Sequence, residues 1–330
     1  MNTFGRVFRV SLFGESHGKA IGVTIDGCPP GMPVKPEDFL PDLNRRKSGK
    51  KGTTPRHEED LPEILSGIYN GYTTGSPVTI ISFNKDVDSD SYRQYSFVPR
   101  PGHADYTSKI KYSGYSDPRG GGHFSGRITW GLVVAGVLAK KILNTSRITA
   151  TLIEAGGRTD IEKAVDEALK ESDSIGGLIE CRVENPPAGL GEPFFYSTES
   201  AISQIVFSIP AVKGVEFGAG FRAASMKGSE HNDPIIDSTG KTLTNNAGGI
   251  NGGITNGNNI ILRVAVKPTS SIGREQSTFD FSTGKMTTLK VEGRHDACIA
   301  LRVPVIVEAA VAIALADLFL IDRGIYGRQA

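Results

Sequence analysis

Three short clusters of histidine or carboxylate beside glycine and arginine are the part of this sequence best suited to chemistry. They are residues 14–18 (GESHG), 100–105 (RPGHAD) and 293–296 (GRHD). Imidazole groups exchange protons near neutral pH, and arginine binds carboxylates and phosphates. Glycines flank His17 and one precedes His103, which favours backbone bends that present both imidazoles rather than bury them. Because the clusters lie far apart in the sequence, only folding could bring them together.

A single histidine in a globular chain is more often a structural residue than a catalyst, so each cluster alone is a weak signal. The glycine, arginine and carboxylate neighbours are what make His17 and His103 candidates. His57 and His231 lack comparable neighbours, and we interpret them as ordinary surface or structural residues.

Five basic residues gather in one short stretch at the end of a predicted helix, next to Gly49 and Gly52. One interpretation is a solvated surface, with cations placed favourably near a helix C-terminus. The other is a flexible basic loop that closes over an anionic substrate. The residue pattern alone favours the solvated surface. The five residues are Arg45, Arg46, Lys47, Lys50 and Lys51.

A glycine-rich segment, residues 119–127 (RGGGHFSGR), ends where a helix is predicted to begin. Its three consecutive glycines would let backbone N–H groups approach an anion, and the helix N-terminus would add a favourable dipole. The alternative is a flexible turn. Two other glycine-rich segments carry no nucleotide motif: residues 248–253 lack the Gly-Lys-Ser/Thr of a P-loop, and no helical pattern follows residues 218–223.

Composition excludes several classes of protein. The 330 residues are 38% hydrophobic and 22% charged, which predicts a packed globular chain rather than disorder. A net charge of +1 provides no global field to recruit nucleic acid or a membrane surface. Three widely spaced cysteines indicate reduced thiols in a cytoplasm, with neither a disulfide framework nor metal-site spacing. Residues 1–10 show no secretion signal, and the apolar run 303–321 contains two acidic residues, which favours a buried core helix.

The elements that must position the clusters are predicted from periodicity and from the 40 glycines and 18 prolines that punctuate the chain. Predicted strands cover residues 4–13, 21–26, 77–83, 147–154, 178–183, 260–266 and 286–291. Predicted helices cover residues 36–47, 126–143, 161–172, 199–209 and 303–322, with Pro36 at a first position and Asp160 as an N-cap. The second and last of these helices are apolar nearly all round and are expected inside the fold. The pattern predicts a mixed α/β (α+β) chain that forms one domain, residues 1–330.

In order along the chain, these segments resemble the chorismate synthase family from about Phe4 to about Leu320. Residues 14–29 (GESHGKAIGVTIDGCP) resemble its first signature, residues 119–127 its central glycine-rich segment, and residues 294–308 (RHDACIALRVPVIVE) its last. Residues 187–193 (PAGLGEP), 212–216 (VKGVE) and 267–271 (KPTSS) match between them. So many ordered matches make chance convergence a negligible explanation.

The resemblance implies a fold, a reaction and partners. The fold would be a β-α-β sandwich with inner helices between outer, mostly antiparallel sheets, assembled as a homotetramer. The reaction would be the anti-1,4-elimination of phosphate from 5-enolpyruvylshikimate 3-phosphate to give chorismate, a carbon–oxygen lyase step of the shikimate pathway. It would use reduced FMN without net redox change, the flavin being reduced by an external reductant. No nucleic acid, membrane or metal partner is expected, and the enzyme would be cytoplasmic.

The resemblance also assigns roles to residues. His17 would be the acid near the departing phosphate, His103 would hold or protonate the reduced flavin, and Asp296 would assist proton transfer at the flavin. Substrate-binding residues would be Arg45, Arg46, Lys51 and Arg127. Cofactor-binding residues would be His123, Phe124, Ser125, Pro210, Ala211, Gly252, Lys267, Pro268, Thr269, Ser270, Ser271 and Arg294.

Three positions depart from the family pattern. His123 stands where an arginine near the flavin is usual, and we expect a weaker contact whose charge depends on pH. Pro210 replaces a frequent asparagine and so removes a side-chain hydrogen bond. Lys51 matches a family arginine only through a one-residue gap, which puts a bidentate contact there in doubt. The alternative function is an FMN-dependent oxidoreductase of a small anionic metabolite; a polyanion-binding module is disfavoured by the neutral charge.

Overall fold

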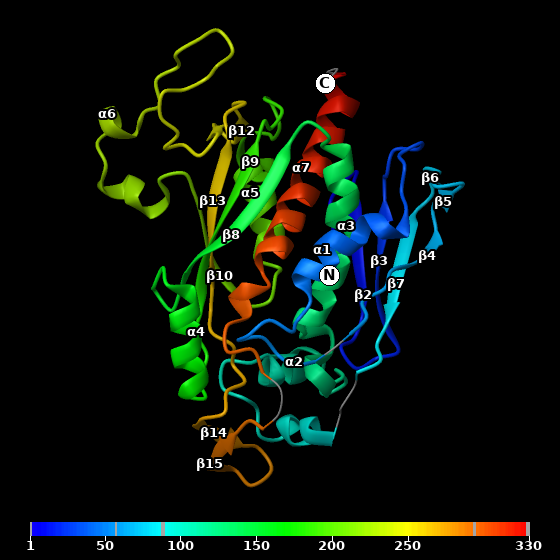
Figure 1. The fold of residues 1–330 in the computed structure, drawn as a ribbon, viewed down its shortest axis with the longest axis vertical. Coiled ribbons are helices and arrows are strands. Elements are labelled where there is room, and N and C mark those ends of the chain that lie inside the picture. The colour runs from blue at the N-terminus through cyan, green and yellow to red at the C-terminus, as the bar shows by residue number, and fades with distance from the viewer. Residues whose placement is uncertain (1, 57, 87–89, 293–294, 328–330) are drawn as a thin grey trace.

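Two antiparallel sheets enclose a layer of helices (Figure 1) in the computed structural model, which describes residues 2–56, 58–86, 90–292 and 295–327. A five-stranded sheet forms one outer layer and a four-stranded sheet forms the other. The helices α3 (Thr129–Ile142) and α7 (Pro304–Tyr326) lie between them. This arrangement confirms the predicted α+β sandwich with inner helices and outer antiparallel sheets.

The five-stranded sheet has the order β1-β2-β3-β7-β4, and every neighbouring pair is antiparallel. Alternate side chains along β3 and β7 face the helices and are fully buried, among them Val23 and Ile80. The chain bends out of the sheet between β1 and β2, so the strand predicted over residues 4–13 is interrupted. The strands are β1 (Thr3–Phe4), β2 (Arg9–Gly14), β3 (Ala20–Asp26), β4 (Glu63–Ser66) and β7 (Val78–Phe83).

The four-stranded sheet has the order β10-β13-β9-β8 and is also antiparallel throughout. In β13 every second residue is buried, from Ile260 to Val266, as expected for a strand with one face on the core. Three of its strands were predicted; β10 was not, because Lys213, Gly214 and Glu216 break its apolar alternation. The strands are β8 (Arg147–Ala155), β9 (Gly177–Glu184), β10 (Val212–Phe217) and β13 (Ile260–Val266).

The two inner helices pack closely because small residues meet at their crossing. A β-carbon on Gly136 of α3 would come within 2.4 Å of the β-carbon of Ala309 on α7. Among the described residues α7 is the one helix long and apolar enough to cross a membrane, but 89% of its most apolar window is buried inside this fold. It is therefore a core helix here, as the two acidic residues within the apolar run 303–321 predicted.

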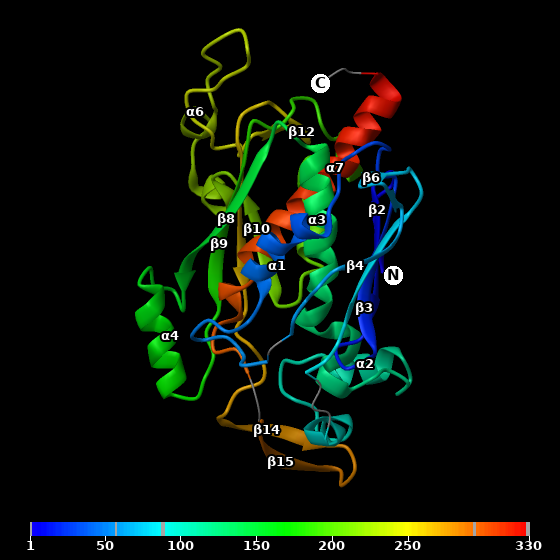
Figure 2. The ribbon, with the colours of Figure 1, turned by 45° about the vertical axis from the view of Figure 1, so that its right-hand side comes forward.

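Three further helices complete the sandwich. The helix α1 (Leu40–Arg46) continues a short 3-10 turn that begins at Pro36 and packs against both inner helices. The helix α5 (Thr198–Val206) also packs on α7, and α4 (Ile161–Lys170) lies at one end of the four-stranded sheet, next to β8 (Figure 2). Asp160 caps α4 by accepting a hydrogen bond from the backbone N–H of Lys163, as predicted.

A small hairpin and a short helix lie together beyond one end of the sandwich (Figures 1 and 2). They are β14 (Glu275–Asp280) with β15 (Lys285–Lys290), and α2 (Asp105–Lys111); of these, only β15 was predicted. The remaining short elements are β5 (Ile68–Tyr69), β6 (Tyr72–Thr73), β11 (Ile250–Asn251), β12 (Ile254–Thr255), α6 (Gly228–His231) and the 3-10 turns η1 (Pro36–Phe39), η2 (Asp90–Ser96), η3 (Arg119–Phe124), η4 (Gly126–Ile128), η5 (Phe194–Tyr196), η6 (Gly220–Ser225) and η7 (Ile299–Leu301).

Candidate active site

Two adjoining cavities lie near the N-terminal ends of α3 and α7. The smaller cavity has a volume of about 230 Å³ and the larger one a volume of about 800 Å³. The volume of the larger cavity is typical of sites for small molecules and cofactors. Two ligands bound side by side in them would therefore meet at a common wall. The residues that line both cavities are Tyr92, Gly120, Ser125, Gly126, Glu292, Asp296 and Ile299.

Four arginines from separate segments line the smaller cavity. Arg46 ends α1, Arg56 lies between α1 and β4, Arg127 lies just before α3, and Arg302 lies just before α7. Buried donors without acceptors are costly, so these side chains indicate an anionic ligand with several oxygen atoms. Their buried nitrogens that have no hydrogen-bond partner within the described part of the chain are Arg46 Nε and Nη1, Arg56 Nε, Arg127 Nη2 and Arg302 Nε.

Asp60 holds two of these arginines in place. Its Oδ2 accepts a hydrogen bond from Arg46 Nη2 at 2.7 Å, and its Oδ1 accepts one from Arg127 Nη1. Burial alone would raise the pKa of the Asp60 carboxyl, but the charges of the two guanidinium groups lower that pKa below its usual value. Because one carboxylate faces two arginines, this wall keeps an excess of positive charge.

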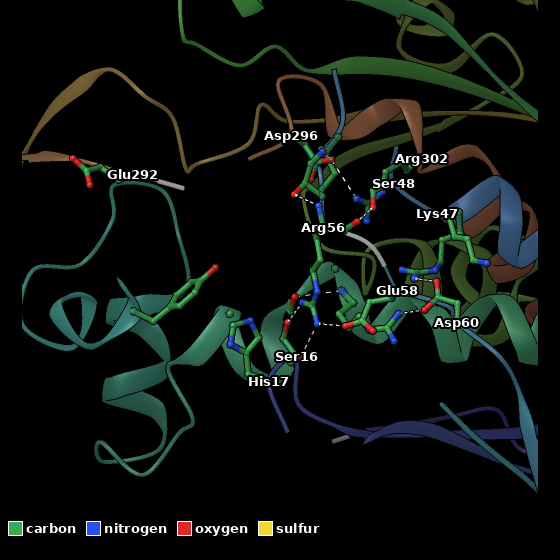
Figure 3. Close-up of a pocket in the computed structure, with 18 residues that line it drawn as sticks. Ser16, His17, Lys47, Ser48, Arg56, Glu58, Asp60, Glu292, Asp296 and Arg302 are labelled. Atoms are coloured by element: carbon green, nitrogen blue, oxygen red, sulfur yellow. Dashed lines mark hydrogen bonds and ion pairs between the residues drawn. The ribbon is translucent and has the colours of Figure 1, made fainter. Parts of the chain in front are cut away.

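Arg56 reaches the middle of the smaller cavity (Figure 3). Its Nη1 donates to Ser16 Oγ at 2.8 Å, and its Nη2 donates to the carbonyl oxygen of Ser16 at 3.0 Å. The same Nη2 donates to Glu58 Oε1 at 2.7 Å. These bonds attach the cluster that contains His17 to the segment that follows the basic stretch.

His17 lines the smaller cavity with a side chain that is largely buried. Its ring packs edge-on against Tyr92, with 5.2 Å between the ring centroids. Gly120 lies directly against the imidazole, since a β-carbon there would come within 2.5 Å of both Cδ2 and Nε2. Gly120 also has φ +58°, in the left-handed region that favours glycine. The absence of a side chain at this position is therefore what lets the imidazole fit.

Asp296 lies on the wall shared by the two cavities. Its Oδ1 accepts hydrogen bonds from the backbone N–H of Thr54 at 2.9 Å and from Arg302 Nη1 at 3.2 Å. Burial lowers the pKa of the Arg302 guanidinium, and the charge of Asp296 opposes that effect. The carboxylate of Asp296 is thus oriented by the loop after α1 and by the segment before α7.

His103 lines the larger cavity and is fixed by a buried ion pair. Its Nδ1 lies 2.6 Å from Asp105 Oδ1, and Asp105 accepts two further bonds from Arg100 Nε and Nη2, both at 2.8 Å. Burial on its own would raise the pKa of Asp105, but hydrogen bonds from Arg100 and His103 lower it well below its usual value. With Nδ1 occupied by Asp105, Nε2 lies near Gly121, 3.7 Å from where its β-carbon would be.

The larger cavity gathers most of the residues expected to hold a cofactor. The segment after β13 lies next to the His103 cluster, because Arg100 Nη1 donates to Ser271 Oγ at 3.1 Å and Ser270 Oγ donates to the carbonyl oxygen of Gly102 at 2.7 Å. The expected residues that line this cavity are His123, Phe124, Ser125, Pro210, Ala211, Lys267, Thr269, Ser270 and Ser271.

Two lysines of the larger cavity lie close enough to repel each other. The pKa of Lys267 is lowered first by burial and then by the charge of Lys213. Lys267 Nζ donates to Ser270 Oγ at 2.7 Å, and the buried Thr269 Oγ1 has no hydrogen-bond partner among the described residues. A multiply charged anion would relieve the repulsion and accept the remaining hydrogen bonds, so this part of the cavity suits a phosphate group.

The three consecutive glycines form a tight left-handed turn. The φ angles of Gly120, Gly121 and Gly122 are +58°, +81° and +54°. A β-carbon on Gly122 would come within 2.2 Å of the carbonyl oxygen of Asp117, so glycine is required for space as well as for φ. The predicted helix start follows, where Ser125 Oγ accepts a hydrogen bond from the backbone N–H of Arg127 at 3.3 Å.

His123 lines the larger cavity but has both ring nitrogens engaged within the protein. Its Nδ1 lies 2.8 Å from the carbonyl oxygen of Gly14, and its Nε2 lies 3.1 Å from Asn2 Oδ1. The imidazole therefore links the end of β2 to the N-terminal segment. The sequence predicted a contact between His123 and the cofactor, but it did not predict this link.

The structure separates Arg45 and Lys51 from the other predicted substrate-binding residues. Arg45 Nη2 pairs with Glu308 Oε1 at 2.6 Å, Lys51 Nζ pairs with Asp166 on the surface, and neither residue lines the two cavities. Arg45 and Arg46 are successive residues of one helix, so their side chains point about 100° apart, and of the two only Arg46 lines the smaller cavity. Gly252 and Pro268 also lie outside the lining of the larger cavity, whereas Arg294 and His57 fall outside the described residues.

The sequence did not single out several residues that build the site. Arg100 belongs to the cluster at residues 100–105 and Arg302 to the segment that resembles the last family signature, so their positions were available as a signal. Arg56 and Asp60 stand in a loop with no periodic pattern, and nothing in the sequence distinguishes them from solvated charges. Only the fold shows that they face Arg46 and Arg127.

Comparisons with known proteins agree with one another over the whole chain. The family model described as chorismate synthase matches residues 8–320. A chorismate synthase from Chitinophaga pinensis is 59% identical over 324 residues, which cover 98% of each chain. One from Korarchaeum cryptofilum is 46% identical over 95% of this chain and 96% of its own. A crystal structure of chorismate synthase superimposes with a TM-score of 0.75 at 28% identity, over 97% of this chain and 94% of that one. The chain belongs to the chorismate synthase family.

Proposed function

We propose that the chain eliminates phosphate from 5-enolpyruvylshikimate 3-phosphate to give chorismate, with reduced FMN bound in the larger cavity. The family assignment makes it a carbon–oxygen lyase that acts on a phosphate ester. The observation that carries the proposal is the set of buried, unpaired guanidinium nitrogens in the smaller cavity, directly beside a larger cavity suited to a cofactor.

The substrate fits the smaller cavity by charge. It carries one phosphate and two carboxylates, and arginine binds both kinds of group through paired hydrogen bonds. Arg46, Arg127 and Arg302 each keep one edge of the guanidinium on a protein carboxylate and leave another nitrogen unpaired within the described residues. The protein carboxylates therefore orient the arginines, and the unpaired nitrogens are left for substrate oxygens.

Reduced FMN fits the larger cavity on the same kind of observation. Lys213 and Lys267 repel each other and Thr269 Oγ1 is unpaired among the described residues, which favours the FMN phosphate at this end. Phe124, Pro210 and Ala211 add apolar surface for a ring system. When bound, the flavin supplies the chemistry that side chains lack, which is help in breaking an unactivated C–H bond with no net change of redox state.

The side chains handle the protons. His17 lines the cavity that holds the arginines, so it is placed to donate a proton to the departing phosphate oxygen. Asp296 lies on the shared wall and accepts or relays a proton between the two cavities. His103, with Nδ1 held by Asp105, keeps Nε2 available to the larger cavity. General acid–base groups of this kind are typically worth about 10²–10⁴ in rate each.

Anaerobic turnover of 5-enolpyruvylshikimate 3-phosphate tests the proposal. Chorismate and inorganic phosphate should appear together only when reduced FMN is present, and the amount of reduced FMN should not fall. A flavin oxidoreductase would instead consume one reduced flavin per product, and the family comparisons do not favour it. Product formation without flavin, or stoichiometric loss of reduced flavin, would contradict the proposal.

Assembly and cellular context complete the proposal. We expect one domain per chain, a homotetramer, an external source of reduced flavin and a cytoplasmic location. Phe194, Phe195 and Phe221 are each more than 80% exposed. Association with further copies of the chain would bury these apolar side chains, which supports the homotetramer. The three cysteines are unpaired and buried, which fits a reducing compartment. A monomer in light scattering at micromolar concentration would contradict the tetramer.

A further inference from the structure

A ring of four charged side chains joins the three helices and runs from the buried Glu308 to the half-exposed Arg45. Arg45 and Asp42 belong to α1, Lys140 to α3 and Glu308 to α7. Arg45 pairs with both carboxylates, at 2.6 Å to Glu308 and 3.2 Å to Asp42. Lys140 does the same, at 2.7 Å to Asp42 and 3.1 Å to Glu308. Charges of opposite sign therefore alternate around a closed ring.

Glu308 is the member whose presence needs an explanation. Its side chain is 2% exposed, on a helix whose surroundings are almost entirely apolar. Its Oε1 accepts from Arg45 Nη2 at 2.6 Å and from the backbone N–H of Ala150 at 2.8 Å, and its Oε2 accepts from Arg45 Nη1 and Lys140 Nζ. A buried ionic group seldom improves stability over an apolar residue, but it fixes which partners meet and in what orientation.

The same three helices deliver arginines to the smaller cavity. Arg46 follows Arg45 at the end of α1, Arg127 lies two residues before α3, and Arg302 lies two residues before α7. Glu308 is six residues from Arg302, about 9 Å along a helix. The positions of α1, α3 and α7 relative to one another therefore set the spacing of the three guanidinium groups.

We propose that the Arg45–Glu308–Lys140–Asp42 ring positions the substrate-binding arginines without touching the substrate. The inference rests on the proposed function, since it assigns the anion in the smaller cavity to the shikimate phosphate. It gives Arg45 a role different from the direct contact that the sequence suggested. The ring fixes the end of α1, the first turns of α7 and the last turn of α3 relative to one another, and through these helices it sets where Arg46, Arg127 and Arg302 meet the substrate anions.

Glu308→Gln separates positioning from direct contact. The amide keeps the shape of the side chain and its hydrogen bond from Ala150, but it removes the charge that holds Arg45 and Lys140. If Arg45 bound substrate itself, its release would leave affinity unchanged or improve it. If the ring positions the helices, affinity for the substrate falls.

Asp317→Asn is the matched control on the same helix. Asp317 is also a buried carboxylate of α7, but it accepts hydrogen bonds from the backbone N–H groups of Arg6, Val7 and Phe8 rather than from the helices that carry the arginines. Both substitutions should lower the melting temperature. Only the substitution in the ring should weaken substrate binding.

The measurement is calorimetric titration of each protein with 5-enolpyruvylshikimate 3-phosphate in the presence of oxidised FMN, so that binding is read without turnover. We expect Glu308→Gln to raise the substrate Kd on the order of tenfold, with Asp317→Asn within twofold of the wild type and FMN affinity unchanged in both. Equal substrate affinity in Glu308→Gln and wild type, despite a lowered melting temperature, would overturn the inference and leave the proposed function intact. Failure of the wild type to bind the substrate would instead refute the proposed function.

Arg45→Lys provides a second variant should Glu308→Gln not fold. Lysine keeps the positive charge of the ring but cannot make two parallel hydrogen bonds to Glu308. The contact between α1 and α7 is therefore weakened, while the net charge of the ring is unchanged. The expected result is a smaller rise in substrate Kd, about threefold, with unchanged FMN affinity. A wild-type Kd in this variant would count against the positioning role.

Discussion

Gly120→Ala should disable the active site by moving His17 rather than by removing it. A β-carbon at position 120 would lie 2.5 Å from His17 Cδ2 and Nε2 and 2.8 Å from Ser16 Oγ. Carbon atoms that are not bonded do not approach this closely, so the imidazole and the Ser16 side chain must both shift. Because Ser16 Oγ also accepts a bond from Arg56, the displacement reaches the middle of the smaller cavity.

The size of the effect has two parts that can be separated. Alanine at φ +58° costs roughly 1–2 kcal/mol of stability relative to glycine, because the left-handed region is unfavourable for L-residues. Displacing a general acid removes its contribution to kcat, about 10²-fold or more. The first part lowers the melting temperature by a few degrees, whereas the second lowers turnover in protein that is still fully folded.

Gly121→Ala is the control for backbone strain. Its φ is +81°, yet its nearest contact would be His103 Cε1 at 3.6 Å, an ordinary van der Waals distance. Both variants should lose similar stability in thermal unfolding, while only Gly120→Ala should lose about 10²-fold in kcat for chorismate formation under anaerobic conditions with saturating reduced FMN. Equal losses of kcat in both variants would refute the reasoning, because strain alone would then explain the effect.

Three further outcomes are expected. Arg127→Lys should raise the substrate KM about 10- to 100-fold, because a charged hydrogen bond is worth about 1.5–3 kcal/mol, while Lys51→Ala should stay within twofold of the wild type in the same steady-state assay. Lys213→Ala should weaken binding of FMN but not of riboflavin in fluorescence titrations; a parallel loss for both would remove the phosphate from that end of the cavity. Asp105, whose pKa is lowered in the folded state, should add stability that is complete above about pH 4 and lost as pH falls further, and Asp105→Asn should flatten the dependence of unfolding free energy on pH in that range.

The layers of the fold could be predicted where periodicity is regular. The strand β13 was predicted with its observed bounds, because every residue from Ile260 to Val266 except Arg263 is β-branched or apolar, and the residues alternate between buried and half-buried positions. The inner helix α7 was predicted from an apolar run interrupted by two carboxylates. The strand β10 was missed, because Lys213, Gly214 and Glu216 hide its pattern. Its identity depends on pairing with β13, which is a tertiary contact.

The site residues that stand in short motifs could be predicted from the sequence. The directions in which neighbouring side chains point could not. His17 and Asp296 stand in motifs and line the cavities, as do Arg46 and Arg127. The charge of Arg45 is identical to that of Arg46, and no sequence pattern says which of the two faces the substrate. That choice depends on the buried Glu308, more than 260 residues away in the chain, which attracts one guanidinium and leaves the other to Asp60.

The wall between the two cavities shows why the function cannot belong to any part of this chain alone. Tyr92, the turn that includes Gly120, and Asp296 come from three distant segments, yet each lines both cavities. Asp296 is held by the backbone of Thr54 on one side and by Arg302, just before α7, on the other. The cavities therefore form only once α7 has docked between the sheets and the loop after α1 has folded against it. Loosening α7 should consequently weaken substrate and cofactor binding together. The ring around Glu308 should affect the substrate side, because α1 and α7, which supply three of its four members, contribute no described residue to the lining of the larger cavity.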